Sequence, residues 1–412
     1  MRKKTSIVLL AAGHACVDVY QGAVAALVPL FVAERAYTYA AASGVVLAAT
    51  LLSSVAQPLF GALTDRWPLP WLLPASTVLG GLGIAAAGVA GSYPLTLACV
   101  ALSGLGVAAY HPESARVARR AGRGSHVAMG WFSLGGNVGF AAAPLLVAAC
   151  GLRLSPLLVV PALAGAALCV PVLRALAADA SGGPAASVAG VAGVAGGAGN
   201  GTGGGTGVDT SAKSEISPPS TKNPVHADDR GSFARLTAAV VFRSVAFVGL
   251  STFIAVYARQ QLGGGPAAGT AALVVLYLGG ALGTVAGGRL AERWDRVTVV
   301  RHAYLLTVAA VAGIVLVPGP AVYLFVAATS AGLYVPFSLQ VTLGQDYLPT
   351  RVGTAAGVTL GLAVSAGGVA APAIGALADA TSLRAALAPL IVMPALAWLA
   401  LRTVPEPPAI TA

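Results

Sequence analysis

Three polar side chains share one face of the first long apolar segment of this chain. His14, Asp18 and Gln21 follow one another at spacings of four and three residues, so a helix places all three on the same side. Ionisable groups are unfavourable inside a membrane and mark a functional site by default. We assign Asp18 to proton coupling, because its carboxyl group can gain and lose a proton as a cavity opens to each side, with His14 modulating it. The alternative is a structural cluster that holds this helix by hydrogen bonds.

Arg243 is an ionisable residue inside the seventh apolar segment. A lone guanidinium there needs a carboxylate or an anionic ligand. The candidates are Asp18 and the phosphonate or carboxylate of a substrate, and one mechanism could use both; backbone carbonyls nearer the cytoplasmic end are the third candidate. We assign Arg243 to substrate binding, together with the amides of Gln21 and Asn137. Asn137 could instead cross-link helices.

Charged residues between the apolar segments are assigned to gates rather than to a substrate site. The pattern Gly-x-Leu-x-acid-Arg-Trp occurs twice, ending in Asp65-Arg66-Trp67 and in Glu292-Arg293-Trp294. Each copy ends one apolar segment and precedes another. The repetition indicates two similar halves, and Asp65, Arg66, Glu292 and Arg293 are the expected gate residues.

A second group of gate residues is expected at the inner ends of the fourth and tenth segments. His111-Pro112-Glu113 is predicted to close the fourth segment at the cytoplasmic edge, because proline ends or kinks a helix. Glu113 is expected to pair with Arg116 and lock the inward gate; an ordinary surface ion pair is the alternative. Asp346, at the inner end of the tenth segment, is likewise expected to be a gate residue.

The composition requires a membrane around these groups. The chain has 412 residues, of which 57% are hydrophobic and 9% charged, whereas soluble domains carry about 25% charged residues. Continuous apolar runs of about 20 residues predict spanning helices. The segments are 7–32, 40–63, 71–90, 94–110, 127–150, 156–173, 233–257, 267–290, 297–317, 321–343, 353–378 and 383–401. This predicts an all-α membrane protein with twelve transmembrane helices in two pseudo-symmetric six-helix bundles.

Charge and composition also predict the orientation and the domains. With both termini cytoplasmic, sixteen Lys and Arg residues near the segments fall inside and four fall outside. Residues 177–231 are rich in small residues and are expected to form a disordered cytoplasmic linker. The expected domains are therefore residues 1–176, this linker, and residues 232–412.

Other function classes are disfavoured by the residues. The basic residues lie between apolar segments and form no nucleic-acid patch. Neither a phosphate-binding Walker loop nor a nucleophile elbow occurs, so an enzyme is not expected. No cofactor or metal is expected, since Cys16, Cys99, Cys150 and Cys169 lack metal-ligand spacing. The expected partners are a small-molecule substrate, protons and the lipid bilayer, around a monomer.

The hairpin Gly61-x-Leu63-x-Asp65-Arg66 resembles the signature loop that joins helices two and three in the major facilitator superfamily. In this copy the usual trailing basic residues are replaced by Pro68-Leu69-Pro70. A narrower resemblance, to the fosmidomycin-resistance branch, is carried by His14-x-x-x-Asp18-x-Tyr20-Gln21-Gly22, Gln57-Pro58-Leu59-Phe60-Gly61, Gly104-Leu105-Gly106 with His111-Pro112-Glu113, Ser133-x-Gly135-Gly136-Asn137-x-Gly139-Phe140, and Gly344-Gln345-Asp346-x-Leu348-Pro349.

The fifth segment resembles the antiporter signature Gly-x8-Gly-x3-Gly-Pro-x2-Gly-Gly. Gly130, Gly139 and Pro144 fit its spacing, Ala143 stands for one glycine, and Val147-Ala148 replace the last pair. Small residues here allow close helix approach, and packing without directional meaning is the other interpretation.

These resemblances imply the major facilitator fold and a secondary active transporter in the inner (plasma) membrane. The implied activity is proton antiport that exports a small drug-like or anionic compound such as fosmidomycin. An importer or symporter of a small organic anion or sugar is the alternative, and a non-transporting receptor or membrane enzyme is a third class.

Overall fold

The computed structural model describes residues 3–67, 69–123, 126–181 and 227–407, which form helices joined by short turns. The helices are α1 (Lys3–Arg35), α2 (Tyr39–Arg66), α3 (Leu72–Val89), α4 (Tyr93–Ala121), α5 (His126–Cys150), α6 (Val159–Ser181), α7 (Arg230–Leu262), α8 (Pro266–Ala291), α9 (Arg296–Leu316), α10 (Val322–Tyr347), α11 (Val352–Ala380), α12 (Leu383–Leu387) and α13 (Val392–Leu401). Short 3-10 turns, Ser155–Leu158, Pro349–Arg351 and Ala388–Ile391, precede α6, α11 and α13.

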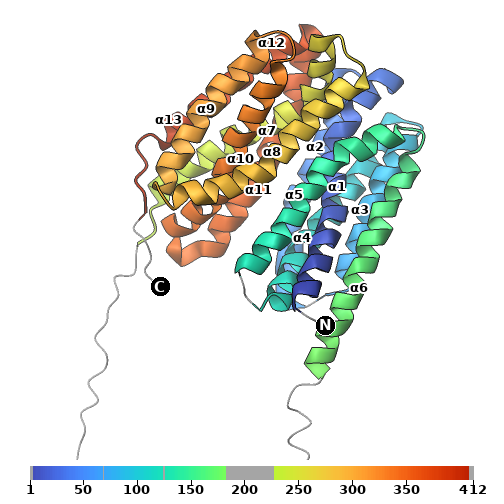
Figure 1. Cartoon of the computed structure of the whole chain (residues 1–412), viewed down its shortest axis with the longest axis vertical. Coiled ribbons are helices and arrows are strands. Elements are labelled where there is room, and N and C mark those ends of the chain that lie inside the picture. The colour runs from blue at the N-terminus through green and yellow to red at the C-terminus, as the bar shows by residue number, and fades with distance from the viewer. Residues whose placement is uncertain (1–2, 68, 124–125, 182–226, 408–412) are drawn as a thin grey trace, which may run out of the picture.

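The helices form two bundles that lie side by side. Helices α1–α6 form the N-terminal half, coloured blue to green, and α7–α13 form the C-terminal half, coloured yellow to red (Figure 1). Among the described residues, twelve helical stretches are long and apolar enough to cross a membrane, with α12 and α13 together supplying the last. The prediction of an all-α protein with twelve spans is confirmed.

The bundles extend slightly beyond their predicted bounds. Helix α6 continues to Ser181, and α7 begins at Arg230 after Asp229, whose carboxylate accepts a hydrogen bond from the Ser232 backbone N–H at 2.9 Å. Hydrogen bonding from Ser232 lowers the pKa of the Asp229 carboxyl group. Both ends therefore take residues from the predicted linker, and the part of that linker between residues 182 and 226 lies outside the described residues.

The prediction that the fourth helix ends at His111-Pro112-Glu113 is wrong. Helix α4 continues through Pro112 to Ala121. A proline removes one backbone donor, which neighbouring helices can compensate inside a membrane protein. Buried Ser114, Val117 and Ala118 carry the packed face of α4 past the proline, so the contacts of this face maintain the helix.

The pattern Ser-x-Gly-Gly occurs at residues 133–136 in α5 and again at residues 365–368 in α11, with the same packing role in both halves. In α5, a Cβ added to Gly135 would come within 2.1 Å of the Ala11 carbonyl oxygen of α1. In α11, a Cβ on Gly367 would come within 2.2 Å of the Ser244 carbonyl oxygen of α7. Glycine thus lets α5 and α11 approach the first helix of their own half closely. This close packing fixes the helix that carries His14 and Asp18.

The two halves join at the end of the molecule opposite the termini (Figure 1). An even number of spans leaves both termini on one face, and α1 ends and α2 begins on the other. Across the halves, α2 packs on α11, α5 on α8 and α1 on α7. Every side-chain hydrogen bond between the halves that the structure describes involves Tyr39 or Ala40, at the start of α2. The protein is therefore closed on the face opposite its termini.

Candidate functional site

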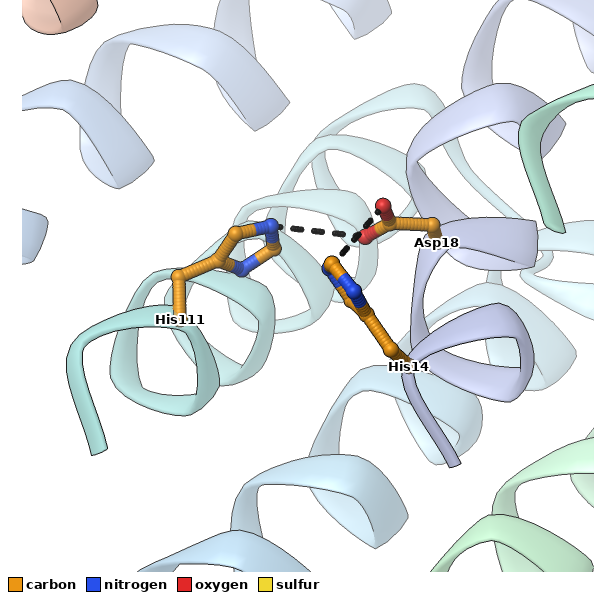
Figure 2. Close-up of side chains that lie close together, drawn as sticks. All are labelled: His14, Asp18 and His111. Atoms are coloured by element: carbon orange, nitrogen blue, oxygen red, sulfur yellow. Dashed lines mark ion pairs between the residues drawn. The ribbon is translucent and has the colours of Figure 1, made fainter. Parts of the chain in front are cut away.

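His14, Asp18 and His111 form one cluster in the N-terminal half, in which His14 and Asp18 are buried and His111 is partly buried (Figure 2). The Nε2 atom of His14 lies 3.3 Å from one carboxylate oxygen of Asp18, and the Nε2 atom of His111 lies 3.4 Å from the other. Helix α1 supplies His14 and Asp18 from successive turns, as their spacing predicts, and α4 supplies His111. The histidine side chains thus point at the same carboxylate from two helices.

The Nδ1 atom of each imidazole lies within hydrogen-bond distance of a backbone carbonyl oxygen. Nδ1 of His14 lies 2.9 Å from the Phe132 carbonyl oxygen, and Nδ1 of His111 lies 2.8 Å from that of Val107. A carbonyl only accepts hydrogen bonds, so both Nδ1 atoms must carry a hydrogen. In a neutral imidazole, the Nε2 atom then presents a lone pair to the carboxylate, which is repulsive. Each contact with Asp18 therefore needs one further proton, placed on Nε2 or on the carboxyl group.

The cluster consequently has places for two exchangeable protons. Asp18 and the ring of His14 are almost completely buried, whereas 26% of the His111 side chain is exposed. Protons can therefore reach the cluster through His111. One atom from each of the three residues that could bind a metal lies within 4.8 Å of the other two, close enough for one small ion to contact them all. Protons satisfy the same contacts without an ion, and the absence of a bound metal stays a prediction.

A cavity lies between the two halves, one helical turn from the cluster. It encloses about 630 Å³ of space between atoms, part of which opens to solvent. Gln21, Thr50 and Ser53 line it from the N-terminal half, and Phe247, Ser251 and Tyr277 line it from the C-terminal half. Gln21 follows Asp18 on α1, and Val107, another lining residue, precedes His111 on α4. Both helices thus connect the cavity directly to the cluster.

Arg243 is buried inside the C-terminal half and lacks an ion pair with any described carboxylate. One of its terminal nitrogens donates to the Leu333 carbonyl oxygen at 3.2 Å, and its guanidinium lies 5.1 Å from the centre of the Phe337 ring. Its Nε atom is buried without a hydrogen-bond acceptor among the described atoms. Of the predicted protein partners, a backbone carbonyl contacts Arg243 and Asp18 does not.

Comparison with known proteins now identifies the fold. Residues 10–372 match the model of the Major Facilitator Superfamily. The chain belongs to this superfamily. It is 29% identical over 403 residues to YfnC of Bacillus subtilis (strain 168), an uncharacterised transporter of the superfamily, covering 96% of this chain and 91% of that one. It is 37% identical over 151 residues to the fosmidomycin resistance protein of Escherichia coli (strain K12), covering 36% of this chain and 37% of that one.

A solved structure agrees with this assignment at the level of the fold. A bacterial homologue of the human lysosomal transporter Spinster, in an inward-facing and unoccupied conformation, superposes with a TM-score of 0.71 at 14% identity. The match covers 100% of this chain and 99% of that one. Together with the superfamily match and the twelve candidate spans, this fold makes the chain a multi-pass membrane protein.

In this major facilitator protein, the position of His111 differs from the one expected from the sequence. His111 was expected at a gate, as the last part of the fourth helix, yet its side chain contacts Asp18. The expected position differs because the helix was expected to stop at Pro112, and the gating role of His111 stays a prediction. A signal was present in the sequence: Ser114, Val117, Ala118 and Ala121 continue the helical spacing of small and apolar residues beyond the proline.

The predicted pair of Glu113 and Arg116 is confirmed. The Arg116 Nε atom donates to one oxygen of Glu113 at 2.8 Å, and a terminal nitrogen of Arg116 donates to the other oxygen. The Glu113 carboxylate is completely buried. The alternative of an ordinary surface ion pair is therefore wrong, because a buried fork of this kind is far less screened than an exposed pair.

In the C-terminal half, Asp346 belongs to an ion-pair network at the face that carries the termini. Arg296 donates to Asp346 and to Glu406, each at 2.6 Å. Glu406 also accepts from the Val297 backbone N–H at 2.9 Å, which ties the end of the chain to α9. The network lies within one half, so it does not bridge the halves in this state.

The remaining predicted residues have separate positions. Arg66, Glu292 and Arg293 are exposed at the ends of α2 and α8 and make no ion pair among the described residues. The Asp65 side chain lies outside the described part of the structure. Asn137 is partly buried on α5 and is absent from the described cavity lining, whereas Gln21 is part of that lining. Their gating and binding roles stay predictions.

Gly136 of α5 gives a direct test of the cluster. A Cβ added there would lie 2.4 Å from an Asp18 carboxylate oxygen and 2.8 Å from the His14 ring. We expect Gly136→Ala to displace the Asp18 carboxylate. The ratio of the substrate affinities at two pH values should then fall by about tenfold, the size of effect expected for loss of a buried hydrogen bond. Gly130→Ala, on the same helix with nothing within 4 Å of its Cβ, is the matched control. Equal binding profiles for the two variants, measured by titration at several pH values, would contradict the assignment.

Proposed function

We propose that this protein exports a small molecule from the cell in exchange for protons. The observation that supports this most strongly is the His14–Asp18–His111 cluster, where fixed Nδ1 hydrogens leave two contacts that each need a proton. The cluster lies one helical turn from a cavity that both halves line. Secondary transporters bind substrate near the midplane between repeats and rock the halves around it. A proton site and a cavity on the same two helices suit coupling of this kind.

The state of the molecule supports an order of events. The positive-inside distribution of Lys and Arg favours both termini in the cytoplasm, within the inner membrane. The protein is then closed to the outside. We propose that the cluster releases a proton in this state and that the cavity accepts substrate. After the halves rock, substrate leaves to the outside and the cluster is protonated again.

The proposed substrate is a small drug-like or anionic compound, with fosmidomycin as the first candidate. The partial match to a fosmidomycin resistance protein supports this choice. Arg243 offers the positive charge that an anionic group needs, and Gln21 offers an amide at the cavity wall. Gly139 of the antiporter-like pattern packs on the Ala15 carbonyl oxygen, whereas Gly130 borders open space, so only part of that pattern has a packing role here.

The sign of the pH effect separates export by antiport from symport. If substrate binding displaces protons, linkage requires that substrate bind more tightly as the pH rises. If proton and substrate travel together, the substrate must bind more tightly as the pH falls. Symport has one physical argument in its favour, because an unprotonated Asp18 repels an anion. Titration of the purified protein with fosmidomycin at several pH values distinguishes the two.

Expression in a fosmidomycin-sensitive bacterium tests the export directly. We expect the minimal inhibitory concentration to rise, since antiport lowers the drug concentration in the cytoplasm by about tenfold for each proton exchanged and each unit of pH difference. Inverted vesicles with an acidic lumen should accumulate the drug, and vesicles with an alkaline lumen should not. Accumulation only with the alkaline lumen would establish symport, and unchanged susceptibility would rule out fosmidomycin.

A further inference from the structure

The two halves are joined by a small set of polar contacts on the face opposite the termini. The backbone N–H groups of Tyr39 and Ala40, at the start of α2, donate to the two carboxylate oxygens of Asp379 at 2.8 and 2.9 Å. Asp379 lies near the end of α11, in the other half. The Tyr39 hydroxyl accepts from the Gln260 side-chain amide of α7 at 2.9 Å. We call these four residues the Tyr39 clamp.

The clamp completes the N-terminus of a helix with a residue from the other bundle. The first turn of a helix has backbone N–H groups without partners in the helix, and a carboxylate there is favoured by hydrogen bonding and by the helix dipole. In α2, Thr38 satisfies the Ala41 N–H through its hydroxyl and the Ala42 N–H through its carbonyl. Asp379 satisfies the two N–H groups before these. Separating the halves here would leave both groups without their acceptor.

Close packing beneath the clamp makes the contact specific. A Cβ added to Gly375, one turn before Asp379, would come within 2.5 Å of the Tyr39 carbonyl oxygen and 2.6 Å of the Ser43 hydroxyl. The Tyr39 ring also meets Phe253 of α7 edge-on, with centroids 6.2 Å apart. Tyr39 is thus held through its backbone, its ring and its hydroxyl by two helices of the opposite half.

The corresponding contact between α5 and α8 lacks this device. The last turn of α5, from Val147 to Cys150, contains no acid, and α8 begins with Gly265 and Pro266 without a side-chain cap. Pseudo-symmetry therefore does not account for Asp379. A charged residue that caps one of two equivalent interfaces indicates a role specific to the opening of that interface.

We propose that the Tyr39 clamp is the latch that keeps the transporter closed on the face opposite its termini, and that its release is required for opening there. Asp379 is the principal element, because it supplies both acceptors. The latch rests on the membership of the chain in a family of alternating carriers and is independent of the proton cluster and of the substrate.

The test measures the distance between the halves on this face. Spin labels at Ser92→Cys and Pro318→Cys, in exposed turns of the two halves, would be introduced into full-length protein whose native cysteines are replaced. We expect Asp379→Ala to increase the population with the longer distance by about tenfold, the effect of losing a helix-capping carboxylate. Asp379→Glu should restore most of the short-distance population.

Asp295→Ala is the matched control. Asp295 also caps a helix, accepting from the Thr298 N–H at 2.7 Å, but within one half; its removal should leave the distance distribution unchanged. If Asp379→Ala does not fold, Tyr39→Phe removes only the bond to Gln260 and should shift the distribution in the same direction by a smaller factor. Distributions equal to that of Asp295→Ala in the variants that fold would overturn the proposal, whatever the result of the fosmidomycin experiments.

Discussion

Membrane vesicles that contain the Asp18→Asn variant are expected to lose all substrate accumulation driven by a pH gradient. An asparagine keeps the volume of Asp18, and its amide N–H groups can donate to the Nε2 lone pair of a neutral His14 or His111, so the fold should persist. It cannot take up a proton, and it removes the negative charge that stabilises a protonated imidazole. A difference of one pH unit corresponds to about a tenfold concentration ratio per proton exchanged. This ratio should fall to one in the variant.

Two further measurements make this prediction specific. Exchange of labelled for unlabelled substrate across the membrane, which requires no net proton movement, should continue in Asp18→Asn. Glu34→Gln, which neutralises an exposed acid near the other end of α1, should leave gradient-driven accumulation intact. If Asp18→Asn still accumulates substrate with the dependence of the native protein, the cluster has a structural role and the proposed coupling site is wrong.

Replacing Arg243 by methionine is expected to weaken substrate binding without lowering the stability of the protein. In the absence of ligand, Arg243 is a buried cation whose Nε atom has no acceptor among the described atoms. Removing such a charge is often neutral or stabilising, because its desolvation is no longer required. We therefore expect the melting temperature of the purified protein to stay the same or to rise by a few degrees. Binding of an anionic substrate should weaken by more than about tenfold.

Arg35 provides the comparison for this experiment. It is also partly buried, but its guanidinium donates to the Thr96 hydroxyl at 3.0 Å and to the Gly88 carbonyl oxygen at 2.5 Å. Arg35→Met should lower the melting temperature and leave anion binding unchanged. Arg243→Lys keeps the charge and loses the planar fork, so it should retain only part of the affinity. Equal anion affinity in Arg243→Met and the native protein would exclude direct contact with the substrate.

Some properties of the site follow from short-range patterns. The period of a helix is enough to place His14 and Asp18 on one face of α1, and the apolar runs are enough to predict twelve spans. The glycines of the Ser-x-Gly-Gly repeat predict close helix packing, because only a residue without a side chain permits it. The low fraction of charged residues predicts a membrane environment. Each of these inferences depends on composition or on residues within a single helix.

Other properties depend on contacts between segments that are distant along the chain. The length of α4 depends on packing that compensates for Pro112, so the position of His111 opposite Asp18 could not be read from its local sequence. Asp379 looks like an exposed acid at a helix end until α2 is seen to begin beside it, 339 and 340 residues away in sequence. By itself, the sequence determined which helices form and which faces are polar. The tertiary structure decided which polar groups meet, because a partner from another helix is set by the packing of whole bundles and not by local spacing.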